Sequence, residues 1–199
     1  MAAGQERIVD AIKMFNHCLT QQALPTQTQQ QIKYHLGQLY IATEQYKKAV
    51  DIFDQWLEKQ MQPSAHADYI IAGALARVGR FQEASALGTR AVSKNPRPPE
   101  PWLRLLASVQ YKAKNLQAME TTLTILVERF PKRQYWLQLA GILMETGQPQ
   151  RSLALLEIAY GRGFLDKSQE LLTLARHYLN EGLPHKGALF LEQAMQAKT

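Results

Sequence analysis

The chain has 199 residues, of which 46% are hydrophobic and 20% are charged, and its formal net charge is +6. This apolar content excludes a disordered chain, and 11 glycines and 9 prolines are too few for a collagen-like or low-complexity sequence. No apolar run approaches the roughly 18 residues that a membrane-spanning helix needs, so we expect no direct insertion into a membrane. The single cysteine, Cys18, excludes an intrachain disulfide.

The chain opens on one predicted helix, residues 5–22, with no predicted partner before it. Its apolar residues have the spacing of those in the helix predicted at 46–60. They are Ile8, Ala11, Phe15 and Cys18, which match Tyr46, Ala49, Phe53 and Trp56. We interpret 5–22 as the second half of a helical repeat. Because an open half-repeat exposes apolar surface, we expect the chain to be a fragment of a longer protein.

Five predicted helical hairpins follow, at 27–60, 64–94, 98–130, 133–161 and 166–197. Their first helices are predicted at 27–43, 64–78, 98–113, 133–146 and 166–181. Their second helices are predicted at 46–60, 81–94, 116–130, 149–161 and 184–197. Gly79 suits the left-handed backbone that often ends a helix, and Pro149 and Pro184 suit helix starts.

Small residues recur through these hairpins with a period near 35. In the first helices they are Gly37, Ala72, Ala107, Ala140 and Ala175. In the second helices the corresponding residues are Ala49, Ala84, Met119, Ser152 and Gly187, and then Trp56, Ala91, Leu126, Ala159 and Ala194. Because closely crossing helices need small side chains, we expect Ala72 and Ala140 to be buried at helix crossings.

This pattern resembles the tetratricopeptide repeat, and the resemblance covers nearly the whole chain. Departures from it are Gln110, Met119 and Leu126 in the third hairpin and Trp56 in the first. The resemblance implies an all-α fold, a right-handed α-solenoid of helix-turn-helix repeats, with about five repeats plus an N-terminal half-repeat. It also implies a single domain over 1–199 that acts as a protein–protein interaction scaffold and not as an enzyme.

The residues give no sign of catalysis or of a cofactor. The five histidines lie on different repeats, and no pair has the i, i+4 spacing of a helical metal site. No glycine-rich loop follows a strand, and no serine or cysteine lies in a nucleophile elbow. We therefore expect no metal, no cofactor and no small-molecule substrate.

In a tetratricopeptide stack the first helix of each pair lines a concave groove that binds a peptide or a helix. The places that usually point into this groove give the predicted partner-binding residues Tyr34, Gln38, Tyr69, Arg77, Arg104, Ser108, Tyr111 and Lys112. Residues 77–133 carry eleven basic and four acidic residues, which favours an acidic partner. Two alternatives stay open: the charges form only a solvated surface, and some of the tyrosines only pack between repeats.

Three stretches, 32–57, 126–165 and 170–195, resemble a narrower group. They are similar to the tetratricopeptide proteins associated with the second type of TonB energy-transduction system of Gammaproteobacteria. The sequences RFPK and YWLQLAG, followed by ALLEIAYGRGFL, are their most distinctive part. This resemblance implies a periplasmic adaptor, with a cleaved leader, that works beside a TonB/ExbB/ExbD complex in iron-siderophore uptake. A cytoplasmic location is the alternative.

Two other functions remain as alternatives. The chain could be an architectural or self-associating repeat protein, a homodimer through exposed solenoid ends. It could also bind RNA, because pentatricopeptide repeats have a similar period. The predicted groove lacks a regular pair of base-reading residues from one repeat to the next, so nucleic acid is the less favoured partner.

Overall fold

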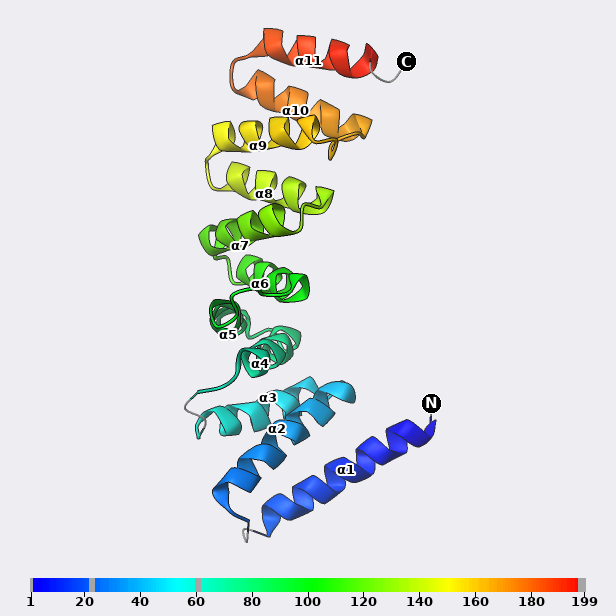
Figure 1. Cartoon of the computed structure of the whole chain (residues 1–199), viewed down its shortest axis with the longest axis vertical. Coiled ribbons are helices and arrows are strands. Elements are labelled where there is room, and N and C mark those ends of the chain that lie inside the picture. The colour runs from blue at the N-terminus through cyan, green and yellow to red at the C-terminus, as the bar shows by residue number, and fades with distance from the viewer. Residues whose placement is uncertain (1, 22–23, 60–61, 197–199) are drawn as a thin grey trace. The chain divides into compact units, whose positions relative to one another are not determined.

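The computed structural model describes residues 2–21, 24–59 and 62–196. In these residues the secondary structure consists of eleven α-helices, without a β-strand (Figure 1). They are α1 (Ala2–Thr20), α2 (Thr26–Ala42), α3 (Tyr46–Leu57), α4 (Ala65–Arg77), α5 (Phe81–Ser93), α6 (Glu100–Lys112), α7 (Leu116–Arg129), α8 (Arg133–Glu145), α9 (Pro149–Gly161), α10 (Ser168–Asn180) and α11 (Pro184–Gln196). The chain divides into two compact units, residues 1–113 and 114–199.

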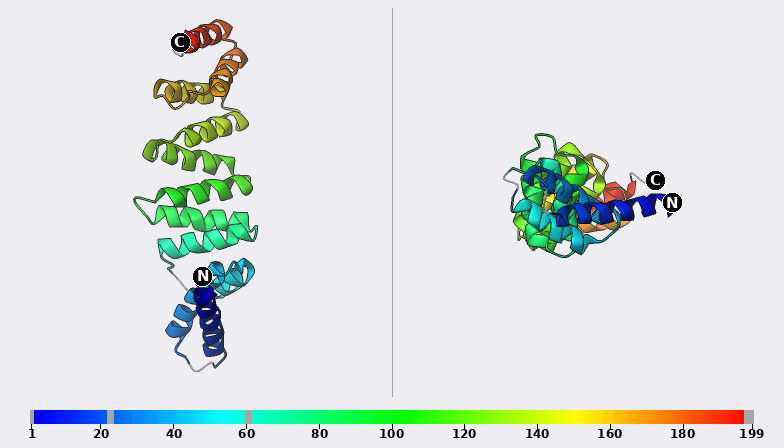
Figure 2. Two further views of the ribbon diagram at one scale, coloured as in Figure 1. Left: turned by 90° about the vertical axis from the view of Figure 1, so that its right-hand side faces the viewer. Right: turned by 90° about the horizontal axis from the view of Figure 1, so that it is seen from below.

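The predicted all-α fold of consecutive helical hairpins is confirmed. Each helix lies within three residues of its predicted bounds, and Pro149 and Pro184 begin α9 and α11 as expected. The predicted helix ends at 22, 60 and 197 lie outside the described residues. Within each unit, helices that follow one another in sequence pack together (Figure 2). The single domain over 1–199 stays a prediction.

The repeated small residues lie where the helices cross. Ala72 is completely buried and Ala140 is 4% exposed, as predicted. The departures Trp56, Gln110, Met119 and Leu126 are also buried, so these larger side chains fill the core. The side chain of Ala194 lies outside the described part of the chain.

The crossing of α2 and α3 shows why one of these places holds glycine. A Cβ atom added to Gly37 would lie 2.4 Å from Cε1 of Phe53, which is completely buried. Helix α1 packs on the same core through Ile12 and Phe15. The Asn16 amide nitrogen donates to the Tyr40 hydroxyl at 3.1 Å. The lone first helix therefore packs against α2.

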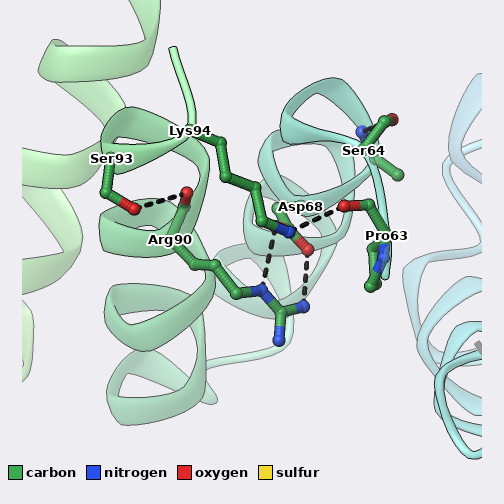
Figure 3. A network of polar contacts seen from close by, with 7 residues as sticks. Pro63, Ser64, Asp68, Arg90, Ser93 and Lys94 are labelled. Carbon is green, nitrogen blue, oxygen red and sulfur yellow. Dashed lines mark hydrogen bonds and ion pairs between the residues drawn. The ribbon is translucent and has the colours of Figure 1, made fainter. Parts of the chain in front are cut away.

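A buried carboxylate joins the two helices of the α4–α5 hairpin (Figure 3). Asp68 on α4 is completely buried and accepts hydrogen bonds from Nη2 and Nε of Arg90 at 2.5 and 2.9 Å. Lys94 Nζ lies 2.9 Å from Asp68 Oδ2 and donates to the Pro63 carbonyl at 2.7 Å. The hydrogen bond to Asp68 raises the pKa of the Arg90 guanidinium. Because both cations bind it, this carboxylate links the start of α4 to the end of α5.

In the second unit, the loop after α9 folds back onto α8. The Trp136 ring stacks on Phe164 at 5.6 Å, and the Arg162 guanidinium lies 5.6 Å from the Trp136 ring centroid. Arg133 pairs with Asp166 at 3.0 Å and with Glu170. These residues lie in the distinctive stretch at 126–165 or just after it, so packing between consecutive repeats accounts for part of that sequence.

Candidate functional site

All eight predicted partner-binding residues lie in the first unit, on the helices predicted to be the first of their hairpins, α2, α4 and α6. They are Tyr34 and Gln38 on α2, Tyr69 and Arg77 on α4, and Arg104, Ser108, Tyr111 and Lys112 on α6. The structure gives each of them a definite environment, but their role in binding a partner stays a prediction.

The four residues on α6 form one exposed stripe. Arg104, Ser108 and Tyr111 follow one another at i, i+4 and i+7, and Lys112 adjoins them. Each of these residues is exposed, and Tyr111 is 49% exposed. A tyrosine that keeps half of its surface in water is not required for the core and remains available to a partner.

The exposed face of α4 continues into that of α6. The Tyr69 ring stacks on Trp102 of α6, with centroids 5.0 Å apart and ring planes at 15°. His66 lies 6.2 Å from the Trp102 ring and 6.5 Å from that of Tyr69. One turn further along α4, a Cβ atom on Gly73 would lie 3.9 Å from Leu105 of α6. We call the surface formed by His66, Tyr69, Gly73 and Arg77 of α4 with Trp102, Arg104, Ser108, Tyr111 and Lys112 of α6 the α4/α6 face.

The two predicted residues on α2 are more engaged within their own hairpin. The Tyr34 ring lies 5.1 Å from Trp56 of α3, and burial raises the pKa of the Tyr34 hydroxyl. Gln38 lies 3.3 Å from the His35 ring nitrogen Nδ1. Among the contacts of the described residues, none links Tyr34 or Gln38 to the predicted residues on α4 or α6. Tyr34 therefore contributes to packing between α2 and α3.

Arg77 ends α4 beside an aromatic ring of the preceding hairpin. Its guanidinium lies 4.6 Å from the Tyr46 ring centroid, which is the geometry of a cation–π contact. Arg77 is nevertheless exposed, so this contact positions the side chain while its outer donors remain free for water or a partner.

The charges on the first helices of this unit are predominantly basic. Helices α2, α4 and α6 contain two acidic residues, the buried Asp68 and Glu100 at the start of α6. The second helices α3 and α5 hold Asp51, Asp54 and Glu83. The positive charge of the chain's middle therefore extends to the α4/α6 face.

Trp102 was not among the predicted residues, although it organises the contact between α4 and α6. It occupies the place that Ala67 and Tyr135 hold in other repeats, and both of these are buried. Trp102 is only half-buried. Trp102 could have been predicted from one signal in the sequence. It is an aromatic residue at a position that faces the preceding first helix, where Tyr69 is also aromatic.

A polar pocket in the second unit offers a weaker site. It is lined by Gln117, Glu120, Thr121, Thr146, Gln148 and Arg151. Arg151 Nη1 lies 2.8 Å from Glu120 Oε1, and Gln148 Nε2 donates to Glu120 Oε2 at 2.8 Å. Its charged groups therefore satisfy one another.

The described residues contain no group of three His, Cys, Asp or Glu side chains that could hold a metal ion. Among the helices in this part of the chain, none is long and apolar enough to cross a membrane.

Comparisons with known proteins connect this geometry to a repeat family. Residues 32–100 match the family model for the tetratricopeptide repeat. A search of curated protein sequences finds no match to the chain.

Solved structures show the same fold at low sequence identity. The chain is similar to a chain of the Naa15/Naa10 complex bound to HypK-THB, with a TM-score of 0.71 and 15% identity, covering 96% of this chain and 31% of that one. It thus spans about a third of the length of that relative. It is also similar to MamA of AMB-1, with a TM-score of 0.62 and 15% identity over 85% of this chain and 92% of MamA. YrrB, described as a TPR protein with an unusual peptide-binding site, has a TM-score of 0.61 and 14% identity over 92% of this chain and 91% of YrrB.

Structural similarity at these low sequence identities shows only a shared fold, whereas the family model matches the sequence of the repeats. Residues 32–100 therefore belong to the tetratricopeptide-repeat family, and the described helices have the fold of tetratricopeptide-repeat proteins.

Proposed function

We propose that the protein is a non-catalytic scaffold that binds a segment of another protein on the α4/α6 face. The observation that supports this most directly is the combination of exposed Tyr111 and Arg104 with the half-buried Tyr69–Trp102 stack. The few residues that carry most of the binding energy at protein interfaces are enriched in tyrosine, tryptophan and arginine. YrrB, which has the same fold, is described as having a peptide-binding site.

Site-specific photo-crosslinking tests this proposal. A photoreactive amino acid is placed at Ser108, on the α4/α6 face, or at the exposed Thr89 on the second helix α5. We expect a crosslinked protein partner from position 108 and not from position 89. Crosslinking from 89 alone would move the binding surface to the second helices, and a product sensitive to ribonuclease would favour RNA binding instead.

A narrower proposal concerns the partner and the compartment. We propose that the scaffold is a periplasmic adaptor whose partner is a component of a TonB/ExbB/ExbD system in iron-siderophore uptake. Its support is the similarity of the stretches at 32–57, 126–165 and 170–195 to TonB-associated tetratricopeptide proteins. The product crosslinked at position 108 can be identified by mass spectrometry, and a partner from a cytoplasmic complex would contradict this assignment.

Self-association is a second candidate function, favoured by apolar residues on the last hairpin. Leu172 and Leu179 of α10 and Leu189 of α11 are 43%, 56% and 48% exposed. Sedimentation analysis of the double variant Leu172→Lys/Leu179→Lys tests this, with Ile158→Lys on α9 as a control because Ile158 is equally exposed, at 50%. A mass that falls only in the double variant would support a homodimer, and an unchanged mass would exclude this surface.

A further inference from the structure

We infer that the segment bound on the α4/α6 face is acidic and carries an apolar side chain that packs against the Tyr69–Trp102 stack. This inference rests on the proposed scaffold function and specifies the chemistry of its partner. Three features of the α4/α6 face support it: its aromatic cluster, its cations and its open backbone.

The aromatic cluster provides a place for an apolar side chain. Tyr69 and Trp102 are half-buried, and the exposed His66 borders both rings at 6.5 and 6.2 Å. Their mutual stacking holds the two large rings in place before a partner arrives. Rigid aromatic groups lose little conformational entropy on binding, which suits them as an anchor for a partner's apolar residue.

The cations on α6 determine the charge of the partner. Arg80, Arg90 and Lys94 on the second-helix side each bind a carboxylate of the chain itself. In contrast, the described contacts include no carboxylate bound to Arg104 or Lys112, and both side chains are exposed. These two cations stand on either side of Ser108 on one helix face, so they can bind successive carboxylates of an extended segment.

The backbone of α4 is open to close approach between these two groups. Gly73 lies one turn after Tyr69, and a Cβ atom there would meet nothing nearer than Leu105 at 3.9 Å. Packing therefore does not require glycine at this position, although glycine weakens a helix relative to alanine. Its absence of a side chain leaves room for the main chain of a bound segment.

Single-stranded RNA also binds basic and aromatic faces, but the ring geometry of this face favours a protein. Bases bind by stacking on free aromatic faces. Tyr69 and Trp102 already stack on each other with their planes at 15°, which occupies one face of each ring.

A random linear peptide library, selected on the full chain, tests the inference. We expect the selected peptides to be rich in Asp and Glu and to share one aromatic or aliphatic residue. Tyr69→Ala should weaken their binding roughly thirty-fold, the loss typical of a truncated interface anchor. Their affinity should also fall as salt is added, because exposed charges are screened.

Two glycine variants provide a matched pair for this selection. Gly73→Gln should abolish peptide binding, because the new side chain covers the centre of the face. Gly141→Gln is the control, since Gly141 holds the same place of the repeat on α8 and a Cβ atom there would meet nothing within 4 Å. Circular dichroism should show both variants to be as helical as the wild type.

Neutral or basic selected peptides would overturn the inference, as would acidic peptides that bind Gly73→Gln as well as the wild type. Displacement of the peptides by a single-stranded RNA that binds more tightly would assign the face to nucleic acid. If a protein crosslinks at position 108 but no acidic peptide is selected, the inference fails while the scaffold function stands. If neither is found, both fail.

Discussion

Two neighbouring faces of the first helices differ consistently from one repeat to the next. The small residues at the helix crossings are all buried: Gly37, Ala72, Ala107, Ala140 and Ala175. The residues that directly follow them are half-buried or exposed: Gln38, Gly73, Ser108, Gly141 and Arg176. On each first helix, therefore, one residue packs in the core and the next residue lies on a surface that a partner can contact.

The difference shows what each face requires of the sequence. At the crossings, only small side chains allow two helices to approach, so the same residue types recur. On the open face, glutamine, glycine, serine and arginine all occur, because helix packing does not restrict them.

Replacing the buried Asp68 should cause the largest loss in the free energy of unfolding. Asp68→Ala leaves Arg90 and Lys94, which are 41% and 34% exposed, without their carboxylate, and losing hydrogen bonds to a charged group costs about 1.5–3 kcal/mol. Urea unfolding measures this loss. Asp10→Ala serves as the control, because the Asp10–Lys13 pair is 68% and 73% exposed, and removing such a pair costs less than about 1 kcal/mol. Equal effects of the two substitutions would show that the ion pairs of Asp68 do not stabilise the hairpin.

A larger side chain should have opposite effects on stability at a helix crossing and at the residue that follows it. Ala140→Leu overpacks the crossing of α8 and α9 and should lower the free energy of unfolding by about 1–3 kcal/mol. Gly141→Leu, one residue later, enters open space and should stabilise the helix by up to about 1 kcal/mol. Thermal unfolding compares the two variants, and an unchanged melting temperature for Ala140→Leu would show that the assigned repeat register is wrong.

The turns between the paired helices offer a smaller, stabilising change. Glu44 has φ of 57°, whereas the corresponding turns hold Gly79 and Gly147 with φ of 85° and 72°. Because left-handed backbone strains residues with a Cβ atom, Glu44→Gly should stabilise the chain by up to about 1 kcal/mol. The reverse change, Gly79→Ala, should destabilise the chain by a similar amount. Chemical denaturation should show a higher free energy of unfolding for the first variant and a lower one for the second.

The smallest effect is a pH dependence from His177 on α10. Burial lowers its pKa below the ordinary value of 6.5, with Glu181 opposing the shift. The unfolded chain therefore binds more protons than the folded chain just below pH 6.5, so stability should decline as the pH falls through this range. His177→Gln should flatten that decline, measured by urea unfolding between pH 7 and pH 5.

The positions of the helices could be predicted from the sequence because one local rule repeats. Small residues with a period near 35 mark the crossing place in each first helix, and glycine marks three of the turns between paired helices, at Gly79, Gly147 and Gly182. The same rule predicted the burial of Ala72 and Ala140, which the structure confirms.

The functional details could be predicted less well, because they depend on contacts between distant residues. Asp68 resembles an ordinary acidic residue near a helix start, and its burial depends on Arg90 and Lys94, 22 and 26 residues later. The pairing of Tyr69 with Trp102 likewise joins two hairpins. The repeat pattern predicted Tyr34 on the groove, and its half-buried ring also lies 5.1 Å from Trp56 of α3, a contact between two helices that the repeat pattern does not give.

The most direct test of the account measures binding of the crosslinked partner to the double variant Tyr69→Ala/Arg104→Ala. We expect this variant to lose binding while keeping its helical circular dichroism spectrum, because truncating an anchor at an interface typically costs about 2 kcal/mol or more. Arg104→Ala alone is the companion measurement, since the exposed Arg104 can be removed without disturbing the Tyr69–Trp102 stack. If the double variant binds the partner as tightly as the wild type, the α4/α6 face is not the binding site.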